Sequence, residues 1–211
     1  MVIDKETKLF GSFSQKPGNK GSKFFNGAFQ RHSINAIYKS YFIEDIEKGV
    51  EAARTLDFKG FAVAMPFKKS ILPFLDEVDS KAKAIGSVNT VVNLDGKFVG
   101  YNTDYLGVCK IFPILDKRET VVVGNGGLAA SVIHCLEERE IEYSTITRTN
   151  WSMLRHLEDQ TVINCTPVSL GELDMSNQLI DLNTGTPFGD LLHRLQAEAQ
   201  FKLYTGIEYG S

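Results

Sequence analysis

The sequence predicts an α/β protein with two halves, and three observations lead to this fold class. Short β-branched or aromatic runs alternate with longer amphipathic segments, which is typical of βαβ units with mostly parallel strands. A glycine-rich turn at 121–130 stands between an apolar strand and a helix. A polar cluster at 101–104 follows a hairpin signal and precedes a helix, which indicates a hinge between two α/β halves.

The first half of the chain predicts alternating strands and helices. Ser22 suits the N-cap of the first helix, and Asp95-Gly96 between two apolar runs is a strong hairpin signal. Pro66 ends the third strand. The expected strands are 8–13, 36–42, 60–65, 87–94 and 97–101, and the expected helices are 23–32, 44–56 and 69–75.

The second half of the chain also predicts alternating strands and helices. Leu191, Leu195, Ala199 and Leu203 recur at helical spacing near the end of the chain, which predicts one apolar helix face there. The expected strands are 120–123, 143–147 and 161–164, and the expected helices are 103–115, 126–139 and 187–205.

Composition excludes several classes of protein. The 211 residues are 43% hydrophobic with a net charge of −3, which supports a large core and argues against a nucleic-acid partner. No apolar run reaches the roughly 18 residues of a membrane span, and the N-terminus lacks a signal-peptide core. The three cysteines are far apart and in no metal-like spacing. We expect a cytoplasmic protein without metal, with reduced cysteines buried as small hydrophobes.

The glycine turn has the context of a dinucleotide-binding site. Gly124 permits the sharp turn after the strand, Gly126 permits close approach of a pyrophosphate, and Ala129 is small enough for helix–strand packing. The helix N-terminus supplies free amides for the phosphates. The alternative is a glycine-rich turn that binds nothing.

The end of the following strand bears on the choice of cofactor. An acidic residue there would bind a ribose hydroxyl, whereas an arginine accommodates a 2′-phosphate. The sequence has Arg148 and no acid at that strand end. This favours NADP over NAD, and the alternative is a solvated surface arginine.

Lys68 and Asp104 are candidates for acid–base chemistry. Lys68 follows a buried strand at a proline-forced turn, and loops at the carboxyl ends of parallel strands bind ligands in α/β proteins. A lysine with a nearby carboxylate can exchange the proton of a substrate hydroxyl. Asn89 and Asn102 are short side chains suited to fixing hydroxyls. By pattern alone, Lys68 and Asp104 are better explained as solvated loop residues.

Seven pieces of the sequence, in order along the chain, together resemble the shikimate dehydrogenase family. The Met-Pro-Phe-Lys piece and the early loop rich in Gly and Asn are most similar to its shikimate dehydrogenase-like branch. The pieces are Met65-Pro-Phe-Lys68, Ile85-Gly-Ser-Val-Asn-Thr90, Tyr101-Asn-Thr-Asp104, Gly124-Asn-Gly-Gly127, Thr147-Arg-Thr149, Asn164-Cys-Thr-Pro167 and Gln196-Ala-Glu-Ala-Gln-Phe201.

The resemblance implies an NADP-dependent oxidoreductase of aromatic amino acid biosynthesis. It would transfer a hydride reversibly between NADP(H) and a cyclic hydroxy acid, either 3-dehydroshikimate/shikimate or quinate, with Lys68 as acid/base beside Asp104. It also implies a substrate-binding catalytic domain at 1–102, a shortened Rossmann-like NADP-binding domain at 103–186, and a final helix, 187–211, that returns to the first domain. The expected assembly is a monomer or homodimer.

The family pattern also implies the residues of two binding sites. Substrate contacts would come from Asn19, Gly21, Ser22, Asn89 and Gln196. The NADP(H) site would use Gly124, Asn125, Gly126, Gly127, Leu128, Ala129, Thr147, Arg148, Thr149, Asn164, Thr166 and Pro167.

The chain also departs from the family pattern. Asn19 and Gly21 stand where the family has two serines for the substrate carboxylate; a second register would use Ser12 and Ser14, and Lys16, Lys20 and Ser22 are other possible anion contacts. The family's Asn-Val-Thr before the proline turn is replaced by Ala62-Val-Ala64, and the cofactor half is trimmed. The lost serines and the trimmed cofactor half favour either an altered substrate or the alternative function, a weakened or inactive homologue that binds a nucleotide or small metabolite.

Overall fold

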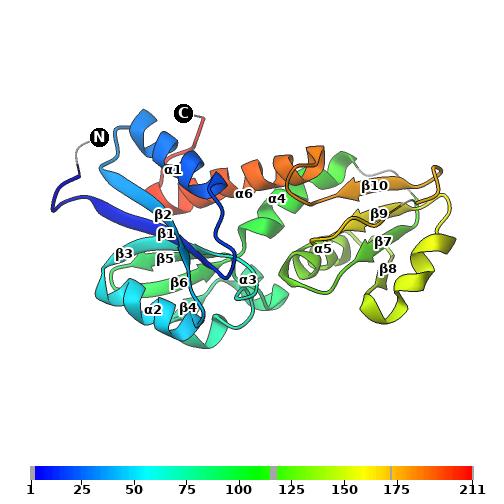
Figure 1. Ribbon diagram of the computed structural model, residues 1–211, viewed down its shortest axis with the longest axis horizontal. Helices are drawn as coiled ribbons and strands as arrows, with labels where there is room; N and C mark the ends of the chain where they lie inside the picture. The colour runs from blue at the N-terminus through cyan, green and yellow to red at the C-terminus, as the bar shows by residue number, and fades with distance from the viewer. Residues whose placement is uncertain (1–2, 115–117, 172, 211) are drawn as a thin grey trace. The chain divides into compact units, whose positions relative to one another are not determined.

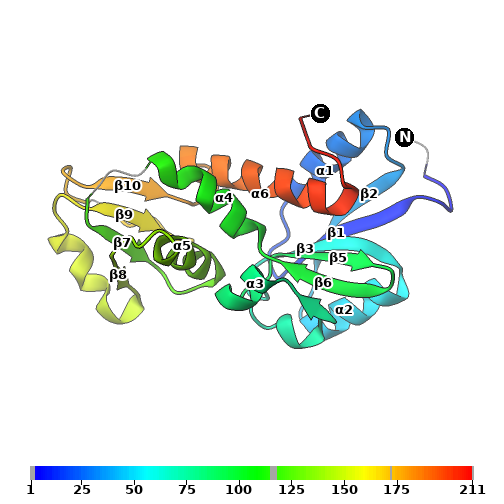
Figure 2. The same cartoon turned by 180° about the vertical axis from the view of Figure 1, so that it is seen from behind.

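The computed structural model describes residues 3–114, 118–171 and 173–210 (Figures 1 and 2). Contacts divide the chain into two compact units. The first unit contains Met1–Thr103 and Ala197–Ser211, and the second contains Asp104–Gln196. The domain boundaries predicted from the sequence follow residues 102 and 186. The chain passes between the units near the start of one helix and in the middle of another.

The first unit is built on a six-stranded mixed sheet of order β2-β1-β3-β5-β6-β4. β1 pairs in parallel with both β2 and β3, whereas β5 runs antiparallel to β3 and β6. The strands are β1 (Lys8–Ser14), β2 (Ala36–Phe42), β3 (Phe58–Val63), β4 (Glu77–Val78), β5 (Thr90–Leu94) and β6 (Lys97–Tyr101).

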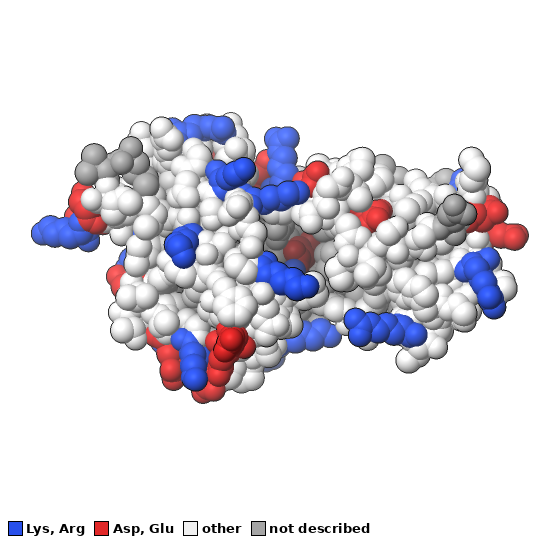
Figure 3. Space-filling model, viewed as in Figure 1, with Lys and Arg blue, Asp and Glu red and all other residues white. Residues whose placement is uncertain are grey.

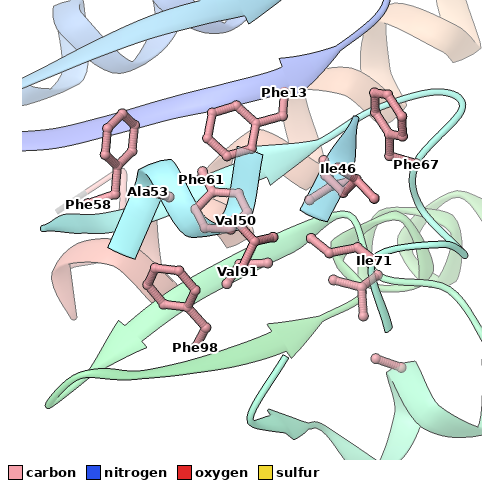
Figure 4. Packing of buried hydrophobic residues seen from close by; sticks show 13 residues of the cluster. Phe13, Ile46, Val50, Ala53, Phe58, Phe61, Phe67, Ile71, Val91 and Phe98 are labelled. Atoms are coloured by element: carbon pink, nitrogen blue, oxygen red, sulfur yellow. The ribbon is translucent and has the colours of Figure 1, made fainter. Parts of the chain in front are cut away.

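Helices cover both faces of this sheet. One face packs on α2 (Ile46–Thr55) and α3 (Ser80–Ile85) through a phenylalanine-rich cluster, part of which is shown in Figure 4. The other face packs on α1 (Lys20–Arg31) and on the last turns of α6 (Pro187–Thr205). β1 serves both layers, since Phe13 belongs to the first cluster and Phe10 to the second.

The second unit has a four-stranded parallel sheet of order β10-β9-β7-β8. One face packs on α4 (Thr103–Ile111), α5 (Gly127–Glu137) and the first turns of α6. The opposite face packs on the 3₁₀ segment η3 (Arg148–His156) and the loop after β9. The strands are β7 (Thr120–Val123), β8 (Tyr143–Ile146), β9 (Thr161–Asn164) and β10 (Gln178–Asp181).

The fold class, with two α/β units and a last helix that ends in the first of them, is confirmed. Strands 36–42, 97–101, 120–123 and 161–164 and helix 187–205 have the expected bounds. The hairpin is also confirmed, since Asp95 and Gly96 both have positive φ angles, 51° and 89°, as a type I′ turn requires.

Several elements differ from expectation. α1 begins at Lys20 with Asn19 as N-cap, so the prediction of Ser22 as N-cap was wrong. The expected helix 69–75 is a series of turns that ends in the 3₁₀ helix Leu72–Phe74, because Pro73 removes an N–H and disfavours helical geometry at the preceding residue. Helix 103–115 ends as α4 at Ile111, followed by the 3₁₀ helix Phe112–Ile114, and Leu115 lies outside the described residues.

The short elements β4, α3, η3 and β10 were missed. β4 has two residues and α3 has six, and segments this short carry no clear hydrophobic period.

Candidate functional site

The candidate residues of the first unit share one edge of its sheet. β3 ends at Val63, whose N–H donates to the Asn89 carbonyl at 2.8 Å. Thr90, the first residue of antiparallel β5, pairs with Tyr101, the last residue of β6. The turn after β3, the start of β5 and the end of β6 therefore lie together. The strand order β2-β1-β3 places a topological switch point between β1 and β3. Open α/β sheets bind ligands beyond the carboxyl ends of the strands at such a point.

Asn89 is the centre of a buried polar cluster. Its Oδ1 accepts from the Thr103 N–H at 2.8 Å and lies 2.9 and 3.1 Å from the hydroxyls of Thr90 and Thr103. Because a backbone N–H can only donate, this contact fixes which side of the amide carries the oxygen. The Nδ2 group therefore takes the other side of the side chain and acts as a donor there.

Gln200 completes this cluster, and sequence reasoning missed its role. It is 3% exposed, and its Nε2 donates to the Thr90 hydroxyl at 2.9 Å and to the Asn89 carbonyl at 3.4 Å. The sequence feature that could have indicated this role is the position of Gln200 one helical turn after Gln196, in the same family-like segment 196–201. Gln200 thus connects the last turns of α6 to the start of β5 by hydrogen bonds.

Lys68 lies in the turn after β3 and is half-buried. Its carbonyl accepts from the Val88 N–H at 2.8 Å. Asn102, at the end of β6, donates from Nδ2 to the Ser87 carbonyl at 2.9 Å. The backbone of Lys68 is therefore held against the segment that leads to Asn89, and the first unit brings Lys68 and Asn89 to the same region.

The start of α1 holds three predicted substrate contacts. Asn19 is exposed, and its side chain makes no capping bond. A Cβ at Gly21 would lie 3.3 Å from the Tyr38 ring, so the helix start lies close against this ring. The Ser22 hydroxyl lies 3.1 Å from that of Ser40 near the end of β2. Ser22 is thus the member of this set with a positioned hydroxyl.

Asp104 and Gln196 belong to the second unit. Asp104, in the first turn of α4, is 4% exposed. A Cβ at Gly107, one turn later, would lie 2.7 Å from Leu192 Cδ1 and 3.5 Å from the Gln196 backbone nitrogen. Since residues three apart share a helix face, Asp104 lies on the face of α4 that approaches α6 near Gln196.

The glycine turn begins directly after β7. Gly124 has a φ of +121°, and a Cβ there would lie 3.2 Å from the Thr166 methyl, so this position favours glycine. Gly126 is the N-cap of α5, and a Cβ there would meet nothing within 4 Å. The N-terminus of α5 therefore faces open space at Gly126. Asn125 is exposed, Gly127 and Leu128 begin the helix, and Ala129 is buried against the sheet.

Thr147, Arg148 and Thr149 follow β8. Thr147 caps η3: its N–H donates to Asn150 Oδ1 at 2.7 Å, and its hydroxyl lies 2.9 Å from that of Thr149. Arg148 is exposed, and its side chain makes no hydrogen bond or ion pair with the described residues. Parallel pairing aligns Val123 with Ile146, so this segment and the glycine turn leave the sheet at the same level.

Asn164 anchors the third loop at this level. It is fully buried; its Oδ1 accepts from the Thr166 N–H at 3.0 Å, and its Nδ2 donates to the Val168 carbonyl at 2.9 Å. Its side chain therefore shapes the loop that carries Thr166 and Pro167. Thr166 is the member of this set that approaches Gly124.

Charged side chains of both signs are interspersed on the face shown in Figure 3. Among the described residues, no group of three or more His, Cys, Asp or Glu side chains is placed to hold a metal ion. Within the same residues, no helix has the length and apolar character needed to span a bilayer. The expectation of buried cysteines holds for Cys135, whereas Cys109 and Cys165 are only half-buried.

The chain is similar in sequence to known shikimate dehydrogenases. The model of the shikimate dehydrogenase substrate binding domain matches residues 20–91. A shikimate dehydrogenase-like protein of Haemophilus influenzae is 40% identical over 152 residues, which cover 71% of this chain and 56% of that protein. The shikimate dehydrogenase (NADP(+)) of Aquifex aeolicus is 31% identical over 196 residues, which cover 82% and 73%.

A solved structure of a shikimate 5-dehydrogenase-like protein matches with a TM-score of 0.82 and 30% identity, covering 98% of this chain and 94% of that one. The chain spans about half the length of several curated relatives that it matches.

Proposed function

The chain belongs to the shikimate dehydrogenase family, and from this premise we propose that it is an NADP-dependent oxidoreductase. The proposed reaction is reversible hydride transfer between NADP(H) and a cyclic hydroxy acid, either 3-dehydroshikimate/shikimate or quinate. Relatives that carry the name shikimate dehydrogenase (NADP(+)) support the cofactor and the substrate class.

One observation carries the proposal: three loops that bear the family's cofactor pieces begin at the same level of adjacent parallel strands. Val123 pairs with both Ile146 and Asn164, so the segments after them leave the sheet side by side. β7 lies at the switch point of this sheet, between β8 and β9, which is the position where dinucleotides bind.

The residues present fit the cofactor. The open space at Gly126 gives a pyrophosphate access to the N–H groups at the start of α5, whose partial positive charge favours phosphate. Arg148 is exposed beside Thr147 and Thr149, and its guanidinium can bind a 2′-phosphate bidentately. When bound, NADP(H) would supply or accept the hydride.

The chain's own residues would manage the substrate proton and orientation. We assign to Lys68 and Asp104 the acid–base roles at the reacting hydroxyl that the family pattern implies. The Nδ2 of Asn89 would donate to a second hydroxyl, because Oδ1 is held by Thr103. Ser22 and Gln196 would complete the substrate contacts.

The direct test is NADP⁺ reduction with shikimate and quinate, after titration of NADPH by fluorescence. We expect turnover with at least one of the two acids. Lys68→Ala should lower kcat by about 100-fold or more with a small change in KM, because general acid–base groups contribute about 10²–10⁴. The neighbouring, exposed Lys69 is the matched control, and Lys69→Ala should leave kcat unchanged. An unchanged kcat in Lys68→Ala would remove this residue from the chemistry.

Two further variants address the cofactor. Gly126→Ala should weaken NADPH binding without loss of stability, since its Cβ meets no protein atom within 4 Å. Arg148→Ala should weaken NADPH more than NADH, whereas Arg155→Ala, an exposed arginine at the other end of η3, should change neither. Equal weakening of both cofactors in Arg148→Ala would contradict its assignment to the 2′-phosphate.

A second candidate function is a homologue that binds nucleotide or a small metabolite without turnover. Gly21 favours it, because this position offers no side chain for a substrate carboxylate and lies close to the Tyr38 ring. NADPH binding in the absence of turnover with either acid would select this candidate.

A further inference from the structure

A cysteine pair lies in the core of the second unit, away from the glycine turn. Cys109 on α4 and Cys135 on α5 are both free, and their sulfur atoms are 2.7 Å apart. Cys109 is half-buried and Cys135 is fully buried. The two sulfur atoms are thus close to the distance of about 2.05 Å at which a disulfide forms. The expectation that these cysteines act only as small hydrophobes does not account for their contact.

A guanidinium group lies against both sulfur atoms. Arg139 Nη1 is 2.7 Å from Cys135 Sγ and 3.7 Å from Cys109 Sγ, and Nη2 donates to the Cys109 carbonyl at 3.3 Å. The neighbouring ionisable groups are Tyr105, which bonds to Glu138, and His134, which lies 3.6 Å from the Glu138 carboxylate. A cation in contact with two thiols is the setting in which one of them becomes a thiolate.

The two thiols differ in acidity. Hydrogen bonds from Cys135, and then from Arg139 and Tyr105, lower the pKa of Cys109 to about 6. The contact with Cys109, together with burial, raises the pKa of Cys135 above its usual range. Cys109 is also the more accessible of the two cysteines, since it is half-buried whereas Cys135 is buried. We therefore assign Cys109 as the nucleophile and Cys135 as its protonated partner.

We propose that Cys109 and Cys135 form a reversible redox pair that hydroperoxides oxidise to an intramolecular disulfide. The Cys109 thiolate attacks one peroxide oxygen, so an S–O bond forms, the O–O bond breaks, and the departing oxygen leaves as alcohol or water after taking a proton. Cys135 then attacks the Cys109 sulfenic acid, forming the S–S bond and releasing water. Two electrons pass from the two thiols to the peroxide.

This bond would join two helices that carry the proposed site. α4 begins at Thr103 and Asp104, and α5 begins at the glycine turn. The disulfide would fix the spacing of these helices inside the second unit. The inference does not depend on the proposed activity, because its readouts are thiol chemistry.

The test treats the full chain with hydrogen peroxide and then counts thiols and maps disulfides by mass spectrometry. The chain has three cysteines, and we expect one free thiol after oxidation, one linked peptide pair containing Cys109 and Cys135, and recovery of all thiols with dithiothreitol. A linkage through Cys165, or a peroxide-treated chain without the 109–135 link, would overturn the proposal.

Variants separate the roles of the two cysteines. Cys135→Ser should stop at a Cys109 sulfenic acid that a dimedone probe traps, and Cys165→Ser, the matched control, should still form the 109–135 link. In the unmodified chain, alkylation of Cys109 by iodoacetamide should rise with pH around a midpoint near 6, because only the thiolate reacts. Arg139→Gln should move that midpoint upward. A wild-type midpoint near that of an ordinary thiol, about 8.5, would contradict the assignment of Cys109 as the nucleophile.

Discussion

Asn89 illustrates what one residue contributes when its neighbours fix it. An asparagine offers an acceptor and two donors on one short side chain, and sequence alone leaves their directions open. The Thr103 N–H fixes the oxygen side, and the hydroxyls of Thr90 and Thr103 gather on the same atom. The donor side is therefore set by the fold, which is the preorganisation that a binding site for hydroxyl groups needs.

The buried hydrogen bonds of Gln200 should contribute to the stability of the fold. Gln200→Met keeps the side-chain length but removes the two hydrogen bonds to Thr90 and to the Asn89 carbonyl. We expect a loss of about 1–2 kcal/mol in the free energy of unfolding, because buried polar groups lose a partner. Urea denaturation measures it. The control is Gln30→Met, at an exposed position of α1, which should change stability by less than about 0.5 kcal/mol. Equal stability of both variants would refute a structural role for Gln200.

The hydrogen bonds of Asp76 should make part of the protein's stability dependent on pH. Its carboxylate accepts from the Phe98 N–H and from Arg54 Nη2, both at 2.7 Å. These two bonds, the backbone bond first, lower its pKa below 3.8. A lowered folded-state pKa contributes stability at pH values above the unfolded pKa, and that contribution is lost as the pH falls through the folded value.

We therefore expect the Asp76 carboxyl to titrate below pH 3.8 in an NMR titration. Asp76→Asn should reduce the loss of stability on acidification. The effect should be small, because the Asp76 and Arg54 side chains are 39% and 36% exposed and solvent screens such a pair. A midpoint at or above 3.8 would show that the two bonds do not persist in solution.

At the scale of elements, the start of α6 depends on a close approach. A Cβ at Gly189 would lie 1.7 Å from the Asn183 carbonyl oxygen, a backbone atom that cannot rotate away. The Thr186 hydroxyl holds the same corner: it accepts from the Gly189 N–H at 3.1 Å and lies 2.5 and 2.7 Å from the Asp181 and Asn183 carbonyls, to one of which it donates. Helix α6 can therefore begin directly after the β10 loop only because residue 189 has no side chain.

Gly189→Ala should accordingly destabilise the protein by about 3 kcal/mol, the upper end for overpacking. Thermal or urea unfolding measures this loss. Gly27→Ala is the matched control, because Gly27 lies inside α1 and its Cβ would meet nothing within 4 Å. That substitution should be neutral or stabilise by about 0.5–1 kcal/mol through helix propensity. A tolerated Gly189→Ala would mean that the corner is looser than this geometry requires.

At the scale of the whole molecule, cofactor binding should be visible as stability. A ligand that binds only the folded chain stabilises it by about 2.7 kcal/mol at 100 times its Kd. We expect NADPH to raise the Tm by several degrees, and the same concentration to have little effect on Gly126→Ala. An absence of any shift at millimolar NADPH would argue against the cofactor assignment.

Sequence patterns were sufficient to predict the alternation of elements, the hairpin, the glycine turn and the bounds of α6. These features depend on local chemistry: the hydrophobic period, the positive φ angles of Asp95 and Gly96, and the flexibility of Gly124. Family resemblance supplied the candidate site, because Lys68 and Asp104 alone are better explained as solvated loop residues.

The contacts that hold the site residues in place could be seen only in the folded chain. The start of α1 at Asn19, the buried bonds of Gln200 and the contact between Cys109 and Cys135 all join segments far apart in the chain. Sequence patterns report the period of one segment and carry no information about which distant groups it meets. Strand register and helix packing determine these long-range contacts, because they determine which side chains share an edge of a sheet or a face of a helix.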